Sequence, residues 1–303
     1  MLKCPICQSP NTKLKYTINK YKYYDCDNCH TLFLYPQPTV KQLAKYYKQE
    51  FSYEAGTQNE KRIRDQAKHI LKNLRKMNPA GKTLLDIGSG LGFFLDEAQK
   101  TGLDATGIEP SKKFTTLSQK LYHNKVFNTN IESYINKHMN IKYDFVTLIN
   151  VIEHFTDPTK SIANASKLLN KKGLFYIETP NHHSWLHKFE KEKYTFLTPP
   201  DHVYIFSLIS FSFLIKDDSS LKIRSVLTYS YPEHFMGIIK NFIRNQKNSS
   251  ILCYPTLPHK KTSNILLKKI KIVLFDGVLA KVFYRLLNCF GNGSFLELYI
   301  KKF

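Results

Sequence analysis

Arginine is scarce in this 303-residue chain, although the formal net charge at pH 7 is +21. Only six of the 45 basic residues are arginines, and the lysines are spread along the whole sequence. Nucleic-acid-binding proteins gain affinity when clustered cations release counterions from phosphates, and arginine is the residue best suited to bidentate phosphate and base contacts. The composition therefore does not favour nucleic acid as a partner, while other anionic partners stay open.

Long apolar runs are also missing. Met1 is followed at once by Lys3, Cys4 and Pro5 rather than by the apolar stretch of a secretory signal. The most apolar late stretch, residues 270–290, is broken by four charged residues and falls short of the roughly 20 apolar residues of a spanning helix. We therefore expect a cytoplasmic protein, and 42% hydrophobic residues predict that it is globular.

Four of the six cysteines form two C-x2-C pairs that are separated by eighteen residues: Cys4, Cys7, Cys26 and Cys29. Each pair can present two thiolates from one tight turn, and two such turns close a tetrahedral zinc site with no open position. The spacing predicts a structural Zn²⁺. Between the pairs, residues 13–18 and 21–25 are rich in strand-forming residues around Asn19 and Lys20, which predicts a hairpin and hence a zinc ribbon.

A glycine-rich turn follows an apolar strand at residues 83–92, and residues 93–101 are expected to form a helix. Glycines at Gly88, Gly90 and Gly92 let the backbone approach a ligand closely at the carboxyl end of the strand. Phe93 replaces the third glycine of the dinucleotide fingerprint, and no Gly-Lys-Ser/Thr of a P-loop follows. The turn therefore predicts a site for a nucleoside-containing ligand without a pyrophosphate.

A second short strand, residues 105–109, ends in an acid, Glu109, and Ser111 is placed to cap the next helix. A carboxylate at the tip of this strand can accept hydrogen bonds from both hydroxyls of a ribose. The pairing of this acid with the glycine turn is more specific than the glycines alone.

From about Leu84 to Pro180 the sequence resembles the class I S-adenosylmethionine-dependent methyltransferases. The resemblance rests on Asp86-Ile87-Gly88-Ser89-Gly90-Leu91-Gly92, on Gly107-Ile108-Glu109-Pro110-Ser111, and on the run 143–158 around the fourth strand. It implies a Rossmann-like α/β fold with S-adenosylmethionine as cofactor. Among the residues that it places at the cofactor are Asp86, Gly88, Ser89, Gly90, Gly92, Glu109, Asn130, Ile131 and Asn150. Asn130 as a turn former and Asn150 as a strand terminator remain alternative readings.

Two histidines are candidate catalytic bases, because the pKa of histidine lies near neutrality. His154 follows the fourth strand, and His202 lies in a segment, 199–207, that resembles a loop of small-molecule methyltransferases. The alternatives are that His154 orients the cofactor loop and that His202 is a packed loop residue. The Asn/Asp-Pro-Pro-Tyr motif of nucleic-acid amine methylases is absent after Asn150. The resemblance therefore implies methyl transfer to a small-molecule or glycan-precursor acceptor. An RNA methyltransferase that uses the ribbon and lysines, and a non-catalytic cofactor-binding module, are the alternatives.

The predicted organisation is a zinc ribbon over residues 1–37, a helical linker over 38–80 and a methyltransferase domain over 81–303. Helical patterning at about 232–290 predicts a cover over the acceptor site. Within it, residues 265–288 combine apolar positions with Lys268, Lys269, Lys271, Lys281 and Arg285, so weak peripheral contact with an anionic membrane is a further possibility. The sequence says nothing about oligomeric state.

Overall fold

The computed structural model describes residues 2–39, 41–43, 46, 59–231 and 291–303. Its central feature is a seven-stranded sheet in the order β10-β11-β8-β7-β4-β5-β6. Five neighbouring strands of this sheet are parallel, and β11 runs antiparallel to both of its neighbours. In chain order the strands are β4 (Thr83–Ile87), β5 (Asp104–Ile108), β6 (Lys125–Phe127), β7 (Tyr143–Ile149), β8 (Leu169–Pro180), β10 (Leu221–Tyr229) and β11 (Phe295–Lys302).

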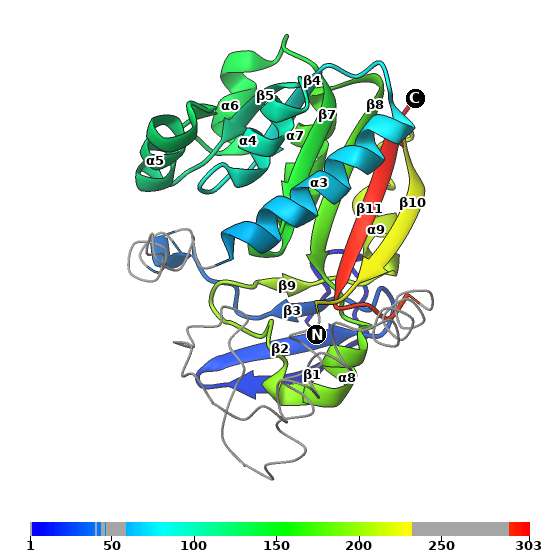
Figure 1. Ribbon diagram of the computed structural model, residues 1–303. Coiled ribbons are helices and arrows are strands. Elements are labelled where there is room, and N and C mark those ends of the chain that lie inside the picture. The colour runs from blue at the N-terminus through cyan, green and yellow to red at the C-terminus, as the bar shows by residue number, and fades with distance from the viewer. Residues whose placement is uncertain (1, 40, 44–45, 47–58, 232–290) are drawn as a thin grey trace, which may run out of the picture.

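Helices cover both faces of this sheet, which makes a three-layer α/β structure. On one face α3 (Glu60–Met77) packs on α4 (Phe93–Lys100), and Figure 1 shows α3 crossing the sheet. Every third or fourth residue of α3 is apolar, so one stripe of the helix, Ala67, Ile70, Leu71 and Leu74, is buried. On the other face lie α6 (Ile131–His138), α7 (Pro158–Lys167) and α9 (Leu208–Leu214), while α5 (Lys112–Tyr122) precedes β6. The predicted Rossmann-like class is confirmed.

The helix starts follow the capping chemistry expected from the sequence. Ser111 accepts a hydrogen bond from the backbone N–H of Phe114 and begins α5. Asp157 accepts one from Lys160, and Pro158 occupies the first turn of α7. Both helices therefore begin immediately after a strand or its short connection, which leaves the carboxyl edge of the sheet to the loops.

The N-terminal module is a second sheet at that carboxyl edge, in the order β1-β2-β3-β9. The hairpin of β1 (Thr12–Ile18) and β2 (Tyr21–Cys26) turns at Asn19, which has a left-handed φ of 54°, as the sequence predicts. β3 (Leu32–Leu34) then pairs with β9 (Tyr204–Ile205), a two-residue strand from the loop after β8. We refer to β1–β3 with their two cysteine turns, residues 2–34, as the ribbon module.

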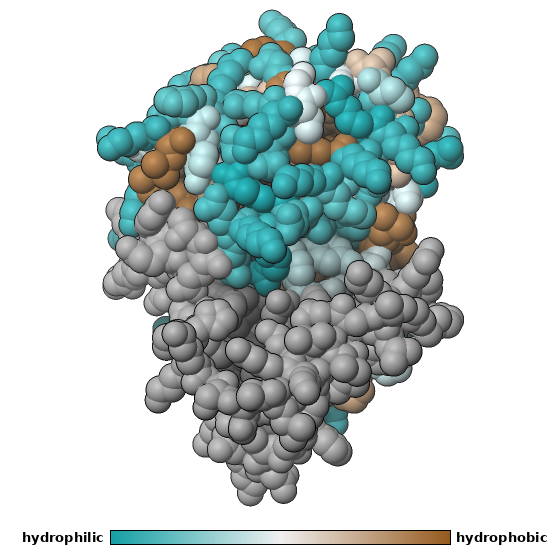
Figure 2. Space-filling model, viewed as in Figure 1, coloured by the Kyte–Doolittle hydropathy of each residue, from teal (hydrophilic) through white to brown (hydrophobic). Residues whose placement is uncertain are grey.

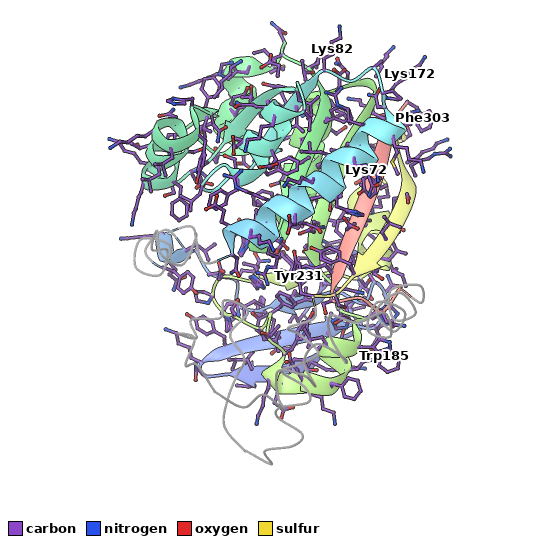
Figure 3. The ribbon with its side chains drawn as sticks, in the orientation of Figure 1. Lys72, Lys82, Lys172, Trp185, Tyr231 and Phe303 are labelled. Atoms are coloured by element: carbon purple, nitrogen blue, oxygen red, sulfur yellow. The ribbon has the colours of Figure 1, made fainter. Side chains whose placement is uncertain are left out.

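Because β9 lies about 170 residues after β3 in the sequence and within the α/β part of the chain, its pairing with β3 joins the ribbon module to the large sheet, and the two share one hydrophobic core. Figure 1 shows the ribbon module beyond the ends of β8 and β11, where α8 (Trp185–Glu190) lies beside it, followed by the 3-10 helix η2 (Lys191–Lys193). In Figure 3, Lys82 and Lys172 mark the opposite edge of the sheet, and Tyr231 lies toward the ribbon module. The loops at the carboxyl edge of the large sheet, which carry the candidate site residues, therefore lie on the side of that sheet nearest the ribbon module.

Two sequence predictions fall partly or wholly outside the described residues. These are the first part of the helical linker over 38–80 and the helical cover at about 232–290. The helix α3, expected within a linker, is packed on the sheet by its buried stripe. The described part of the chain contains no helix long and apolar enough to cross a membrane.

Candidate functional site

The glycine turn after β4 has the backbone that its sequence demands. Gly88 and Gly92 have φ of 76° and 82°, a left-handed region where a side chain is strained. A Cβ on Gly88 would lie 2.6 Å from Val151 Cγ2, and one on Gly92 would lie 2.0 Å from Ser118 Oγ. Glycine at position 88 therefore lets the turn after β4 contact the segment that follows β7.

Glu109 lies directly beside this turn, because β5 pairs in parallel with β4 and their last residues, Ile108 and Ile87, are partners. Glu109 is the first residue after β5, as Gly88 is the first after β4. Its carboxylate accepts hydrogen bonds from the backbone N–H of Gly90, at 2.9 Å, and of Ser111, at 2.7 Å. Burial raises the pKa of Glu109, and these two hydrogen bonds oppose the shift. A carboxylate has about four lone-pair positions, so two of them are left for hydroxyl donors.

Asp86 lies within the same edge, on β4. Its Oδ1 accepts a hydrogen bond of 2.6 Å from Thr147 Oγ1, and the side chain is buried. Burial raises the pKa of Asp86 to about 7, against the Thr147 hydrogen bond, and the charge of Glu109 adds to the increase. Ser89, also buried, has a hydroxyl oxygen without a hydrogen-bond partner among the described residues. Both groups are therefore prepared for a polar ligand.

The remaining residues assigned to the cofactor also have local structural roles. Asn130 caps α6 by accepting a hydrogen bond of 2.9 Å from the backbone N–H of Ser133, and Ile131 is buried. Asn150 has a left-handed φ of 53° after β7 and donates from its amide to Glu178 Oε1 at 2.8 Å. Asn150 is nevertheless exposed at the carboxyl edge, where a ligand on the glycine turn can meet it.

The two candidate histidines are neighbours in space, although they are 48 positions apart in the sequence. His154 ends the 3-10 helix η1 (Ile152–His154) after β7, and the ring centroids of His154 and His202 lie 4.8 Å apart. His154 Nδ1 donates a hydrogen bond of 3.1 Å to the backbone oxygen of Asp201, and the same nitrogen lies 2.9 Å from Asp201 Oδ1, which makes an ion pair when His154 is protonated. His202 Nδ1 donates to the backbone oxygen of Phe196 at 2.8 Å, so the neutral ring carries its lone pair on Nε2.

The surroundings of His154 and His202 shift the pKa values of their imidazoles in opposite directions. Burial alone would lower the pKa of His154, but the Asp201 carboxylate raises it to about 9. Burial, and then the positive charge of His154, lower the pKa of His202 to about 4. Between these values the pair holds one extra proton, on His154, while His202 stays neutral. Such a separation is typical of an acid and a base that work together.

The sequence reasoning did not single out Glu153 and Asp201 as site residues. Glu153 is buried, accepts a hydrogen bond of 3.0 Å from Thr179 Oγ1, and has its pKa raised to about 7 by burial. One oxygen or nitrogen atom from each of Glu153, His154 and His202 lies within 4.8 Å of the others. The adjacent pair Glu153-His154 was a signal for this cluster, but nothing in the sequence indicated Asp201.

The four cysteines come together in the ribbon module, and their four sulfur atoms all lie within 4.8 Å of one another. The Sγ atoms of Cys4 and Cys29 are 3.6 Å apart, and those of Cys7 and Cys26 are 3.5 Å apart. Each C-x2-C turn is closed in the same way, since Gln8 N–H donates to Cys4 O and His30 N–H donates to Cys26 O. Both turns end in a left-handed residue, so each presents its pair of sulfurs inward.

The glycine turn and Glu109 at the carboxyl edge of the sheet agree with the comparison to protein families. The family described as a methyltransferase domain matches residues 59–216, just over half of the chain. The chain belongs to this family. The methyltransferase-domain match runs from α3 to α9 and includes β9, whereas the ribbon module, β10 and β11 lie beyond it.

Curated relatives of this methyltransferase-domain chain match only a part of it. The ubiquinone biosynthesis O-methyltransferase of Aromatoleum aromaticum is 29% identical over 116 residues, 35% of this chain and 47% of that protein. The ubiquinone biosynthesis O-methyltransferase of Hydrogenovibrio crunogenus is 27% identical over 110 residues, 33% of this chain and 43% of that protein. The chain therefore matches less than half the length of these relatives.

Two solved structures share the fold over most of the chain. A SAM-dependent methyltransferase from Archaeoglobus fulgidus has a TM-score of 0.52 and 15% identity, covering 83% of this chain and all of that one. The plantazolicin methyltransferase BamL, solved in complex with a triazolic desmethylPZN analog and SAH, has a TM-score of 0.54 and 15% identity, covering 86% of this chain and 94% of that one. At this identity the likeness concerns the fold alone.

Proposed function

We propose that the chain is an S-adenosylmethionine-dependent methyltransferase that acts on a small-molecule or glycan-precursor acceptor. The observation that carries this proposal is the convergence of two groups at one sheet edge. The glycine turn and Glu109 lie at the ends of β4 and β5. His154 follows β7 in the segment whose Val151 lies so close to Gly88 that a Cβ there would be 2.6 Å from Val151 Cγ2, and His202 packs against His154. Methyltransferase family membership supports the same reaction class.

The residues present fit this cofactor. Glu109 would hold the ribose through its two remaining lone-pair positions, and Gly88, Gly90 and Gly92 would let the backbone approach the ligand. Asp86 and the unpartnered hydroxyl of Ser89 would face the methionine part, with Asn150 beside it and Asn130 and Ile131 toward the adenine. When bound, S-adenosylmethionine supplies a methyl group that its sulfonium has already activated.

The histidine pair would handle the proton of the acceptor. His202 is neutral at pH 7 and can accept a proton at Nε2. His154, which the Asp201 carboxylate keeps protonated, can stabilise negative charge that develops on the acceptor atom. The protein's other contribution is to hold the acceptor in line and to exclude water.

The four cysteines would hold a structural Zn²⁺. A tetrahedron with Zn–S bonds of about 2.3 Å has sulfurs about 3.8 Å apart. The observed separations of 3.6 and 3.5 Å are close to this value and far from a disulfide bond of about 2.05 Å. With all four positions taken by sulfur, the metal would fold the ribbon module and take no part in methyl transfer.

Calorimetry with S-adenosylhomocysteine tests the cofactor assignment. Glu109→Ala should weaken binding by about 1.5–3 kcal/mol for each charge-assisted hydrogen bond that it removes. Asp104→Ala is the matched control, because Asp104 is an exposed acid at the other end of the same strand. Preference for NAD, or equal affinities in wild type and Glu109→Ala, would refute the proposal.

A further inference from the structure

Tyr23 connects the ribbon module to the histidine pair. It lies on β2 with its side chain fully buried, and its hydroxyl donates a hydrogen bond of 2.7 Å to the backbone oxygen of His202. The two residues are 179 positions apart in the sequence. The residue that carries one of the two candidate catalytic rings is thus held directly by the N-terminal module.

Other contacts fasten the same segment, residues 201–207, to the ribbon module. The backbone N–H of Leu34 donates to Val203 O at 2.9 Å, where β3 pairs with β9. Ser207 Oγ donates to the backbone oxygen of Cys29 at 2.8 Å. The segment therefore has one side attached to the cysteine-containing strands and turns.

Its opposite side faces the segment after β7. Val203 N–H donates to Glu153 O at 2.9 Å, and Asp201 accepts from His154 as described above. The His202 ring is fixed from within its own loop by the Phe196 backbone oxygen. Consequently the distance between the His154 and His202 rings depends on two attachments, one to η1 and one to the ribbon module.

We propose that Tyr23 is a positioning residue, through which the ribbon module sets the placement of His202 relative to His154. The inference rests on the function proposed for the histidine pair. Without the Tyr23 hydroxyl, the His202 backbone oxygen loses a buried donor, so the loop gains freedom to move away from η1. Misplacement of a reacting group by about 1 Å is enough to slow an enzyme severely, so this attachment bears directly on the reaction.

The test compares Tyr23→Phe with Tyr24→Phe in the whole 303-residue chain, as purified. Tyr24 is the neighbouring residue on the opposite face of β2, where its ring packs against Phe33 and Tyr35. Two readouts need no acceptor. One is the ¹⁵N NMR signature of the imidazoles, and the other is the rate at which diethylpyrocarbonate modifies each histidine, followed by peptide mass mapping.

We expect Tyr23→Phe to shift the imidazole resonances of His202 and to raise its modification rate about two- to tenfold, the factor that one neutral hydrogen bond contributes. Tyr24→Phe should leave both unchanged. His138, half-buried at the end of α6 and away from the ribbon module, serves as the internal reference for modification. Unchanged resonances and rates at His202 in Tyr23→Phe would overturn the proposal.

A second variant covers the case in which Tyr23→Phe does not fold. Ser207→Ala removes a different hydrogen bond between the same segment and the ribbon module, and it should change the His202 signature in the same direction. If it leaves His202 unchanged, the ribbon module does not position the ring. Binding of S-adenosylhomocysteine, measured in parallel, separates this outcome from a failure of the proposed methyltransferase function, because it reports on the glycine turn and Glu109.

Discussion

Glu109 and Asp86, two acids at the same sheet edge, differ in how strongly hydrogen bonds stabilise their ionised carboxylates. Glu109 accepts two backbone N–H groups, whereas Asp86 is more completely buried and accepts a hydrogen bond from Thr147 alone among the contacts described. The pKa of Asp86 is raised to about 7 by its burial, so its protonation changes with pH near neutrality. A cationic ligand beside this carboxyl would favour its ionised form.

We predict that cofactor binding is pH-dependent through Asp86. A ligand with an ammonium and a sulfonium group favours the ionised carboxylate, so affinity for S-adenosylmethionine should rise with pH and level off above about pH 7, with a slope of at most about tenfold per pH unit. Calorimetry in buffers of different ionisation enthalpy should detect a released proton near pH 6. Asp86→Asn should abolish this dependence, and Asp104→Asn should keep it; a pH-independent affinity in the wild type contradicts the prediction.

At the residue scale, the sequence predicted those site residues whose roles depend on residues close to them in the chain. Glu109 and the glycines could be assigned because a strand, a turn and a helix follow one another within 30 residues. The contacts of Asp201 with His154 and of Tyr23 with His202 could not, since they join residues 47 and 179 positions apart. No periodicity encodes such pairings.

At the scale of elements, β8 and β11 bring two buried carboxyl groups face to face. Glu178 and Glu297 are directly paired, and both contact the hydroxyl of Tyr176, at 2.9 and 2.8 Å. A hydroxyl has one proton and can donate to only one of them. The second contact is favourable if that carboxyl is protonated and donates to Tyr176, in line with the raised pKa of Glu178, which burial and then the charge of Glu297 cause.

We predict that this pair makes the protein less stable as pH rises. A carboxyl group whose pKa is raised by folding stabilises the protein fully below the unfolded-state pKa of about 4.3, and this contribution is lost as pH rises through the folded value. Glu178→Gln keeps a neutral group there, so its unfolding free energy should exceed that of wild type increasingly above pH 5, by up to about 1.4 kcal/mol per pH unit. Urea unfolding from pH 5 to 8 measures this. Glu192→Gln, at an exposed site on η2, should show no such trend, and a parallel pH dependence of Glu178→Gln and wild type would contradict the prediction.

The ribbon module yields a prediction about metal. We expect one tightly held zinc per chain in protein purified without added metal, measured by elemental analysis. Cys26→Ser should lose the zinc and the hydrogen-exchange protection of β1–β3, because structural zinc contributes roughly 10–16 kcal/mol in peptides of this kind. S-adenosylhomocysteine should still bind, since the glycine turn rests on β4 and β5. Cys253→Ser, a cysteine without paired spacing, is the control; substoichiometric metal with intact protection would contradict the zinc assignment.

Elements were predictable where their pattern was long. The buried stripe of α3 and the apolar strands β4 and β7 agree with their sequence periodicity. β8 begins at Leu169, but Asn170, Lys171 and Lys172 follow at once, so no apolar pattern marks its start. The strand β9 has two residues and no pattern of its own, so its pairing with β3 could not be foreseen, and the domain boundaries at 37 and 80 remain predictions.

At the scale of the whole molecule, the formal net charge of +21 at pH 7 comes mostly from lysines spread along the sequence. Figure 2 shows that the face over α3 is predominantly hydrophilic, in keeping with the exposed Lys61, Lys68, Lys72 and Lys76 on that helix. Scattered lysines of this kind give solubility and weak attraction to any polyanion. If RNA were the acceptor, binding should be tight and strongly salt-dependent, with a specific affinity that exceeds this general attraction.

For residues 265–288, which lie outside the described part of the chain, we predict weak contact with anionic membranes. Their sequence mixes apolar residues with five cations, so it suits either a packed cover whose lysine stems extend along the surface or a helix on an anionic bilayer. Each cation near anionic headgroups contributes about 1 kcal/mol, an attraction that salt screens. We therefore expect weak cosedimentation with vesicles containing phosphatidylserine at low salt, and none at high salt or with neutral phosphatidylcholine vesicles. Replacing the five cations by glutamine should abolish it, whereas salt-resistant binding to neutral vesicles would mean that apolar side chains insert and that the packed-cover interpretation is wrong.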